Sequence, residues 1–284
     1  MYKISYSYLM QTVGITGASG IMGQVLMKNN PDINWVSFEG DLLNPGDLKN
    51  WFEGLGHKTE KFIHLAAIVP THLVDQDPIK AMRVNVEGTC LFLEQVRQHN
   101  PQAWIFLAST AHVYASSETP LREESKLEPI SWYGLTKLHA EQWASALSGR
   151  YEMPLCIGRI FSCSSPLHPK TYFLPAMVEK ISKAPRGGKL EIRGLKGTRD
   201  FQTAEQACAA IRFLMDRKAQ GVFNVASGVP VKLHDLVLEI QKRLGREDVK
   251  IVPLDTETSH LTADVSKLKE LGFQPRFDLG ELLN

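Results

Sequence analysis

The chain has 284 residues, of which 43% are hydrophobic and 22% charged, and its formal net charge is +1. This composition is typical of a soluble globular protein with a core large enough for one α/β domain, or for a nucleotide-binding domain with a smaller companion. The near-neutral charge argues against a nucleic-acid partner or an anionic membrane surface, so local groups would have to hold an anionic ligand. No apolar run reaches the ~18 residues of a transmembrane helix.

The four cysteines are too scattered for a metal site. Cys90, Cys156, Cys163 and Cys208 form no CxxC pair and no cluster with metal-ligand spacing. In a chain of this size they are typical of reduced thiols in a cytoplasmic protein without a bound metal. Residues 1–11 carry one lysine and several hydroxyls, unlike a signal peptide, and we expect them to lead into the first strand.

Apolar, β-rich runs alternate with helical patterns through the first 161 residues. Strands are expected at 12–16, 34–38, 61–67, 103–109 and 155–161, and helices at about 20–29, 45–55, 78–99 and 134–149. Alternation of this kind, with near-continuous apolar strands, predicts a fold of the α/β class. We expect a Rossmann-like, doubly wound parallel sheet with helices on both faces.

The composition and the spacing of apolar residues change after residue 161. Two stretches rich in Pro, Gly and Ser, at 162–175 and 183–201, are separated and followed by short helical patterns. We therefore predict a dinucleotide-binding domain over 1–161 and a smaller substrate-binding region over 162–284, partly interwoven with the first. This region should lie against the carboxyl edge of the sheet, where open α/β folds bind ligands.

The first predicted strand runs directly into TGASGIMG, in which Gly17, Gly20 and Gly23 have the spacing GxxGxxG. Glycines here permit a tight turn and a close backbone approach, and the following helix directs its N–H groups at a pyrophosphate. An acidic residue about 20 positions further on would bind the ribose hydroxyls of NAD. Glu39 and Asp41 are both candidates, and the alternative is that one of them caps the helix at 45–55.

Tyr133 and Lys137 lie four positions apart in a predicted helix and therefore on one helical face. A phenol has a pKa near 10 and is a poor base at neutral pH, but nearby positive charge favours the phenolate and lowers the pKa. The spacing alone is also compatible with two structural residues that happen to be in register.

Taken in chain order, the motifs make the sequence similar to the extended short-chain dehydrogenase/reductase family of nucleotide-sugar epimerases, dehydratases and ketoreductases. TGASGIMG resembles the family's cofactor loop, and GDLLNPGDL its adenine-contacting segment. HLAAIVP, VNVEGT, LASTAHVY and YGLTK follow in the family's order, and GTRDF, GVFNVASG and ADVSKLKELGF resemble later landmarks. The resemblance implies cofactor contacts by Gly17, Ser19, Gly20, Ile21, Met22, Gly23, Glu39, Asp41, Leu42, Leu65, Ala66, Ala67, Asn85, Ser109, Tyr133 and Lys137.

The resemblance also implies the catalytic roles and the assembly. Tyr133 would move the proton, Lys137 would support it and hydrogen-bond the nicotinamide ribose, and Thr110 would position the reacting oxygen of the sugar. A homodimer is expected, in which the helices at 78–99 and 134–149 pair across a two-fold axis. The apolar residues at helical spacing in these segments are Met82, Val86, Phe92, Leu138 and Trp143.

The N-terminal half is shorter than the family pattern. Only 24 residues separate Gly17 from Asp41, which leaves room for one helix and one strand, so we expect one βα unit to be shortened or merged. The resemblance implies NAD or NADP as the cofactor, and the shortened half does not by itself distinguish the two. Glu39 favours NAD, because a carboxylate repels a 2′-phosphate and no arginine follows the strand to bind one.

The resemblance places Ala111 and His112 where the family's 4,6-dehydratases have a Thr-Asp-Glu pattern. Dehydration needs a further acid and base, so the missing carboxylates argue against a 4,6-dehydratase. His112 could titrate near neutrality, but we expect it to be structural.

In the family that the sequence resembles, an asparagine that helps to hold the substrate phosphates commonly stands where this chain has Ser162. Arg199 in GTRDF is retained, and its guanidinium suits bidentate phosphate recognition. Arg159, Arg193 and Lys196 are secondary candidates for that role. The sequence indicates neither the sugar nor the nucleotide base.

We predict NAD(P)-dependent oxidoreduction at a hydroxyl or keto carbon of a nucleotide-linked hexose. A 4-ketosugar reductase is favoured over a 4-epimerase, because a shortened adenosine pocket should hold the cofactor less tightly. The alternative from another class is a dinucleotide-binding regulator without catalysis, which would not need Tyr133, Lys137 and Thr110.

Overall fold

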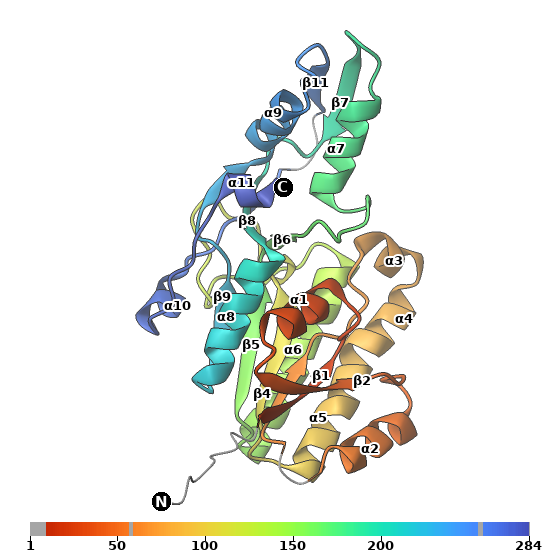
Figure 1. The fold of residues 1–284 in the computed structure, drawn as a ribbon, viewed down its shortest axis with the longest axis vertical. Coiled ribbons are helices and arrows are strands. Elements are labelled where there is room, and N and C mark those ends of the chain that lie inside the picture. The colour runs from red at the N-terminus through yellow and green to blue at the C-terminus, as the bar shows by residue number, and fades with distance from the viewer. Residues whose placement is uncertain (1–9, 57–58, 255–257, 284) are drawn as a thin grey trace, which may run out of the picture.

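The computed structural model describes residues 10–56, 59–254 and 258–283. Its centre is a six-stranded, fully parallel sheet with the order β2-β1-β3-β4-β5-β9 (Figure 1). The strands are β1 (Gln11–Thr16), β2 (Ile33–Phe38), β3 (Lys61–His64), β4 (Trp104–Thr110), β5 (Leu155–Ile160) and β9 (Gly221–Val225). The predicted α/β class and parallel sheet are confirmed. Most of the predicted N-terminal lead-in, residues 1–9, lies outside the described residues.

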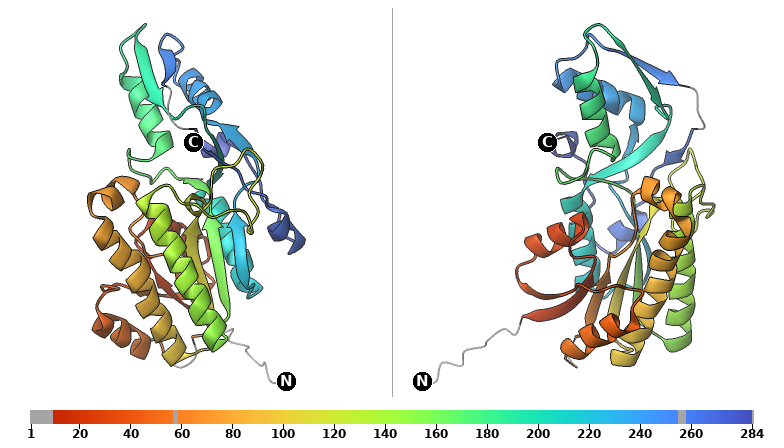
Figure 2. Two further views of the ribbon diagram at one scale, coloured as in Figure 1. Left: turned by 180° about the vertical axis from the view of Figure 1, so that it is seen from behind. Right: turned by 90° about the vertical axis from the view of Figure 1, so that its right-hand side faces the viewer.

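Helices cover both faces of this sheet, as the right-hand view of Figure 2 shows. The helices α1 (Ile21–Asn29) and α8 (Ala204–Asp216) pack with strand residues into one core cluster. On the other face, α2 (Pro45–Gly54), α5 (Gly88–His99) and α6 (Trp132–Tyr151) enclose a second core cluster. The inner strands β1, β3, β4 and β5 are buried on both sides, which explains their near-continuous apolar sequences.

The N-terminal half of the sheet is short, as the spacing predicted. Among the described residues only β2 lies outside β1, so β2 is an edge strand and the chain passes from it through α2 to β3. The loop after β2 therefore carries both Glu39 and Asp41.

The segment expected as one helix over 78–99 is instead interrupted. It consists of α4 (Pro78–Met82), a π-helical turn (Arg83–Glu87) and α5, and a short helix α3 (Thr71–Gln76) precedes them. A π turn widens the helix locally and is often found at functional sites. Here it carries Asn85.

The C-terminal region forms a second layer above the carboxyl ends of the strands (Figure 1). Leu174, Ile181, Phe201 and Val237 are buried in its own core cluster. Residue 161 does not end the central sheet, however, because α8 returns to cover it and β9 pairs with β5. The remaining elements of this region are β6 (Ser162–Ser164), α7 (Phe173–Lys183), β7 (Lys189–Arg193), β8 (Thr198–Thr203), β10 (Pro230–Lys232), α9 (Leu233–Arg243), β11 (Lys250–Leu254), β12 (His260–Leu261), α10 (Ser266–Glu270) and α11 (Leu279–Leu282).

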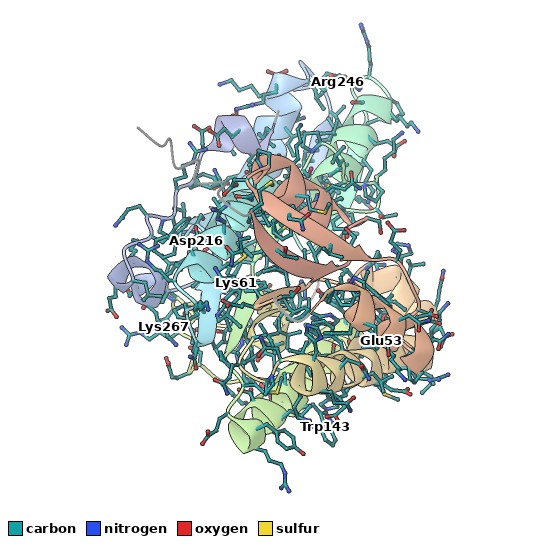
Figure 3. The ribbon with its side chains drawn as sticks, turned by 60° about the horizontal axis from the view of Figure 1, so that its bottom comes forward. Glu53, Lys61, Trp143, Asp216, Arg246 and Lys267 are labelled. Atoms are coloured by element: carbon teal, nitrogen blue, oxygen red, sulfur yellow. The ribbon has the colours of Figure 1, made fainter. Side chains whose placement is uncertain are left out.

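Three of the five residues expected on a dimer surface belong to the core. Val86, Phe92 and Leu138 are buried, because these positions face the sheet and the neighbouring helices. Met82 and Trp143 are 40% and 57% exposed. Figure 3 shows Trp143 at the outer surface. Only Met82 and Trp143 of the set are therefore available to a partner.

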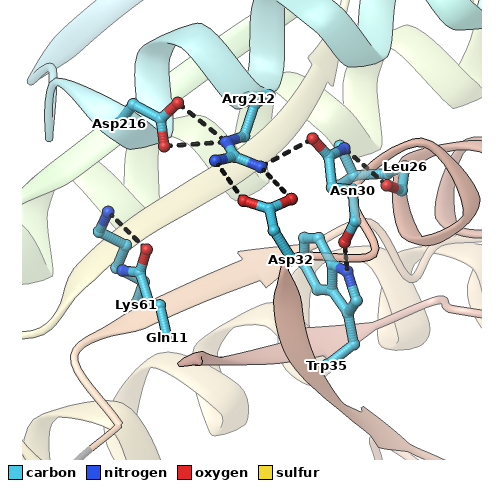
Figure 4. A network of polar contacts seen from close by, with 8 residues as sticks. All are labelled: Gln11, Leu26, Asn30, Asp32, Trp35, Lys61, Arg212 and Asp216. Carbon is cyan, nitrogen blue, oxygen red and sulfur yellow. Dashed lines mark hydrogen bonds and ion pairs between the residues drawn. The ribbon is translucent and has the colours of Figure 1, made fainter. Parts of the chain in front are cut away.

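A polar network joins α8 to the loop between α1 and β2 (Figure 4). The Arg212 guanidinium donates to both carboxylate oxygens of Asp32, at 2.9–3.0 Å, and to Asn30 Oδ1 at 2.9 Å. It also pairs with Asp216 one helical turn away. The hydrogen bonds from Arg212 lower the pKa of Asp32. The network also holds α8 against the loop that leads into β2.

None of the helices within residues 10–56, 59–254 and 258–283 is long and apolar enough to cross a membrane.

Candidate functional site

A cleft of about 1340 Å³ lies between the carboxyl ends of the strands and the C-terminal region. The loops after β1, β2, β3, β4 and β5 form its floor, and β8 and the start of α7 form its other wall. Its position is the ligand crevice expected of an open parallel sheet. The cleft is long enough to bring the glycine loop, Tyr133 and Arg199 into one continuous space.

The glycine loop is shaped by close backbone contacts. Gly17 has φ of 74°, a conformation that favours glycine, and a Cβ on it would lie 2.6 Å from the Ala66 nitrogen. A Cβ on Gly23 would lie 2.5 Å from the Gly17 oxygen. The N-cap of α1 is Gly20, which has no capping side chain, so the first N–H groups of the helix remain available to an anion.

All six predicted residues of this loop line the cleft: Gly17, Ser19, Gly20, Ile21, Met22 and Gly23. The turn and the helix N-terminus together fit a pyrophosphate.

Glu39, Asp41 and Leu42 also line the cleft, beyond the end of β2. Neither acidic residue caps α2. That role belongs to Asn44, whose side-chain oxygen accepts a bond from the Gly46 nitrogen at 2.9 Å. Asp41 Oδ1 accepts from the Leu43 nitrogen, which leaves Glu39 as the carboxylate better placed for ribose hydroxyls.

The loop after β3 places Leu65, Ala66 and Ala67 on the cleft wall, but Asn85 is not among the lining residues. The Asn85 amide is fully engaged in the protein. Its oxygen accepts from the Ile68 nitrogen at 2.7 Å, and its nitrogen donates to the Ile68 oxygen and to Thr136 Oγ1, both at 3.0 Å. Asn85 therefore holds the loop that lines the cleft and does not itself face it.

Tyr133 and Lys137 lie at the start of α6, whose N-cap Ser131 accepts a bond from the Gly134 nitrogen. Both side chains line the cleft and are largely buried, with 8% and 4% of their surface exposed. Thr110, at the end of β4, lines the same cleft and lies close enough to Tyr133 to lower the pKa of the phenol. The structure thus brings together the three side chains that the sequence predicts to be catalytic.

The protein groups alone do not lower the pKa of Tyr133. Burial raises the pKa of Tyr133 to about 12, against the opposing effect of the Thr110 hydrogen bond. Burial also lowers the pKa of Lys137 to about 8, although Glu141 partly opposes this shift. Tyr133 is therefore a neutral phenol at neutral pH, the form that can donate a proton.

A buried ion pair lies behind this catalytic group. Arg159 donates from Nε and Nη2 to the Glu141 carboxylate at 2.7–3.1 Å, and both side chains are about 95% buried. The Ser109 hydroxyl also donates to Glu141, so Ser109 lines the cleft with its hydroxyl already engaged. Arg159 does not line the cleft, and its predicted secondary role in phosphate binding is not supported by its position.

Ser162 and Arg199 line the opposite wall, whereas Arg193 and Lys196 do not line the cleft. Arg199 Nη1 and Nη2 each donate at 2.6 Å to Ser259, which orients the guanidinium. Burial lowers the pKa of Arg199, so a bound anion would relieve an uncompensated charge.

Sequence reasoning missed several residues of the cleft. His112, expected to be structural, is exposed to the cleft beside Tyr133, with 5.9 Å between the ring centroids. Tyr172 and His168 stack at 4.1 Å and line the wall before α7. The available signal was the irregular composition of residues 162–175, which contain three prolines and two aromatic residues.

Within the described part of the chain, no group of three or more His, Cys, Asp or Glu side chains is placed to hold a metal ion.

A glycine loop on a parallel sheet, with a Tyr-Lys pair and a threonine in the same cleft, defines a dinucleotide-binding protein of the short-chain dehydrogenase/reductase type. Comparison with known proteins agrees. Residues 18–284 match the family described as GDP-mannose 4,6 dehydratase. The chain belongs to this family, within the extended short-chain dehydrogenases/reductases, and is an enzyme of that type.

Individual relatives span nearly the whole chain. A dTDP-4-dehydro-6-deoxyglucose reductase from Escherichia coli is 24% identical over 294 residues, covering 92% of each chain. The structure of RMD from Pseudomonas aeruginosa complexed with NADPH has a TM-score of 0.85 and 21% identity, covering 96% of each chain. The UDP-glucose 4-epimerase of Thermus thermophilus, complexed with NAD, has a TM-score of 0.82 and 17% identity, again covering 96% of each chain. The solved structures share the fold.

Proposed function

We propose that the chain is an NAD(P)-dependent reductase of a nucleoside-diphosphate-linked 4-ketohexose. The observation that carries the proposal is that Tyr133, Lys137 and Thr110 line the same cleft as the phosphate loop. Reduction of a ketone adds a hydride to carbon and a proton to oxygen. A nicotinamide dinucleotide supplies the hydride when it is bound.

Different residues of the cleft would bind the cofactor, position the substrate and donate the proton. The free N–H groups at the start of α1 fit the pyrophosphate of the dinucleotide, and Glu39 fits its adenosine ribose. Thr110 orients the ketone oxygen, Tyr133 donates the proton, and Arg199 pairs with a phosphate of the nucleotide sugar. The E. coli relative, named as a reductase of a 4-dehydro sugar, supports this assignment.

Carboxylates are scarce at the reacting end of the cleft. Among the lining residues that the structure describes, Glu39 and Asp41 are the acidic ones, and both follow the edge strand β2. Neither is near Thr110, at the end of β4. This supports a reductase over a 4,6-dehydratase, whose elimination of water needs an acid and a base beside the sugar.

NAD is the proposed cofactor in preference to NADP. The loop after β2 offers Glu39 and Asp41 to the cleft, and among the described lining residues of this loop there is no arginine or lysine for a 2′-phosphate. A homodimer in the cytoplasm is also proposed, in which Met82 and Trp143 contribute to the contact between subunits.

The test is to supply the purified chain with dTDP-4-dehydro-6-deoxyglucose or the corresponding GDP-linked ketohexose, together with NADH or NADPH. Oxidation of the reduced nicotinamide is followed by its absorbance, and the reduced sugar is identified by mass spectrometry. Stoichiometric consumption of the cofactor supports a reductase. Tightly retained NAD and interconversion of two 4-epimers without net consumption would instead identify a 4-epimerase. A chain that binds cofactor and transforms neither kind of sugar would be a regulator.

A further inference from the structure

A buried carboxylate lies one helical turn beyond Lys137 on the same face of α6. Tyr133, Lys137 and Glu141 follow one another at intervals of four residues, so their side chains form one row along the helix. Glu141 is 4% exposed and is not among the residues that line the cleft. It can therefore influence a ligand in the cleft only through its neighbours, and Lys137 is the neighbour that lines the cleft one turn away.

Three elements meet at the Glu141 carboxylate. Arg159 on β5 donates to it from Nε and Nη2 at 2.7–3.1 Å, and the hydroxyl of Ser109 on β4 donates to Oε1. Ser109 and Arg159 are directly opposite each other in the register of the parallel sheet, so both reach α6 from adjacent strands. The sheet thus fixes the carboxylate, and one turn of α6 sets its separation from Lys137.

The ion pair does not act on Lys137 as a neutral unit. Glu141 opposes the fall in the pKa of Lys137 that burial causes. The remaining nitrogen of the Arg159 guanidinium, Nη1, is engaged with the Tyr114 hydroxyl and the Glu123 carbonyl, at 2.9 and 2.8 Å. The pair therefore acts on Lys137 as a negative group, because its carboxylate belongs to the same helix face.

The charge of Lys137 is finely balanced at neutral pH. Its pKa is about 8, so roughly three quarters of the chains carry an ammonium at pH 7.5. A pKa one unit lower would leave roughly one quarter. The ammonium is the form that favours the phenolate left on Tyr133 after proton donation, so a small change in the surroundings of Lys137 matters to the site.

The other groups that share this space titrate elsewhere. Burial and the Lys137 charge lower the pKa of His64 on β3 to about 3. The pKa of His112, in the turn after β4, is about 4, and that of Tyr133 is about 12. None of these three changes charge near pH 8, where Lys137 does. The elements that pack against α6 carry the further titratable side chains His72, Asp75, Lys80, Arg83, Glu87, Cys90, Glu94, Arg97, His99, Cys156 and Arg159, and α6 itself carries His139, Arg150 and Tyr151.

We propose that Glu141 is a positioning residue, whose buried carboxylate, held by Arg159, keeps Lys137 in its ammonium form at neutral pH. Its effect on reduction rests on the proposed function, in which Lys137 supports proton donation by Tyr133. The two single changes have opposite consequences. Glu141→Gln leaves the Arg159 cation without a counter-charge, so Lys137 should lose its proton more easily. Arg159→Met leaves the Glu141 anion alone, so Lys137 should retain its proton more firmly. A loss of packing alone gives no reason for shifts of opposite sign.

The experiment measures the charge of Lys137 directly. The full-length chain is labelled with lysine that carries ¹³C at the ε-carbon and is titrated by NMR without substrate or cofactor, and the signal that Lys137→Met lacks is that of Lys137. We expect a midpoint near pH 8 in the wild type. It should be at least ~1 pH unit lower in Glu141→Gln and at least ~0.5 pH unit higher in Arg159→Met. The alkaline limb of kcat/KM for reduction of dTDP-4-dehydro-6-deoxyglucose should move with it.

Two further variants separate charge from folding. Arg212→Met removes two ion pairs near the amino end of β2 (Figure 4), so it should lower the unfolding temperature and leave the lysine titration unchanged. Glu141→Leu combined with Arg159→Met removes both charges together, which keeps the test open where a single variant does not fold. Its midpoint should lie between those of the two single variants and below that of the wild type. Thermal unfolding checks that each variant is folded.

The outcomes distinguish this role from the reductase assignment. An unchanged titration in Glu141→Gln, or shifts of the same sign in Glu141→Gln and Arg159→Met, overturns the role of Glu141. A midpoint of the double variant at or above that of the wild type also overturns it. The expected NMR shifts in a chain that reduces neither the dTDP-linked nor the GDP-linked ketohexose remove the reductase and support the role of Glu141. An alkaline limb that stays in place while the NMR midpoint moves overturns the link between this charge and reduction.

Discussion

Removing one partner of the buried Arg159–Glu141 pair should destabilise the chain strongly. The Arg159→Met variant keeps most of the side-chain volume but removes the three hydrogen bonds to the Glu141 carboxylate. It also removes the bonds from Arg159 Nη1 to the Tyr114 hydroxyl and the Glu123 carbonyl, at 2.9 and 2.8 Å. Glu141, which is 4% exposed, would keep the hydrogen bond from the Ser109 hydroxyl but lose its buried counter-charge.

The magnitude follows from the burial of that charge. Breaking a buried pair by removing one partner costs about 3–5 kcal/mol, because the other charge stays uncompensated. For a protein of this size that corresponds to roughly 6–20 °C in the unfolding midpoint. A double variant, Arg159→Met with Glu141→Leu, removes both charges and should recover a substantial part of the loss.

The assay is thermal unfolding of the wild type, both single variants and the double variant, followed by circular dichroism at one protein concentration. The matched control is Arg122→Met, because Arg122 forms an ion pair with Asp264 but is 72% exposed, and it should shift the midpoint by only a degree or two. If Arg159→Met shifted the midpoint no more than Arg122→Met does, the buried pair would not stabilise the fold as reasoned here.

Four other outcomes are expected. Tyr133→Phe should lower turnover at least ~10²-fold and leave cofactor affinity nearly unchanged, since it removes the proton donor and keeps the ring; retained activity against a confirmed substrate would contradict this. Arg199→Ala should raise the Michaelis constant for the nucleotide sugar roughly ten- to a hundredfold, and Arg199→Lys should recover part of it; equal nucleoside-diphosphate affinities in titrations would remove Arg199 from the site. Gly23→Ala should weaken cofactor binding, measured by calorimetry, because its Cβ would lie 2.5 Å from the Gly17 oxygen. Sedimentation at micromolar concentration should give twice 31.8 kDa, and a Trp143→Glu variant should shift the mass towards one chain.

The sequence by itself determined the features that depend on local pattern. Parallel strands buried on both faces are apolar along their whole length, so β1, β4 and β5 could be located without a structure. The glycine loop and the Tyr133–Lys137 spacing follow from the geometry of a turn and of one helix. The short N-terminal half was also visible, because the length of chain limits the number of strands.

The tertiary structure decided what each polar group does. Nothing near Asn85 in the sequence shows that its amide bonds Ile68 and Thr136, and nothing near Ser109 shows that its hydroxyl donates to Glu141. The same holds for the return of α8 and β9 to the central sheet. These are contacts between segments far apart in the chain, and local sequence patterns carry little information about them.

His112 shows this limit most clearly. From the sequence it was one titratable residue near a strand end, with a structural role expected. Its place beside Tyr133 depends on the close approach of its turn to Gly134 of α6, and its lowered pKa depends on its enclosure by the walls of the cleft and on Arg199 of β8. A side chain acquires its chemistry from the charges and hydroxyl groups around it, and here those come from three separate segments that only folding brings together.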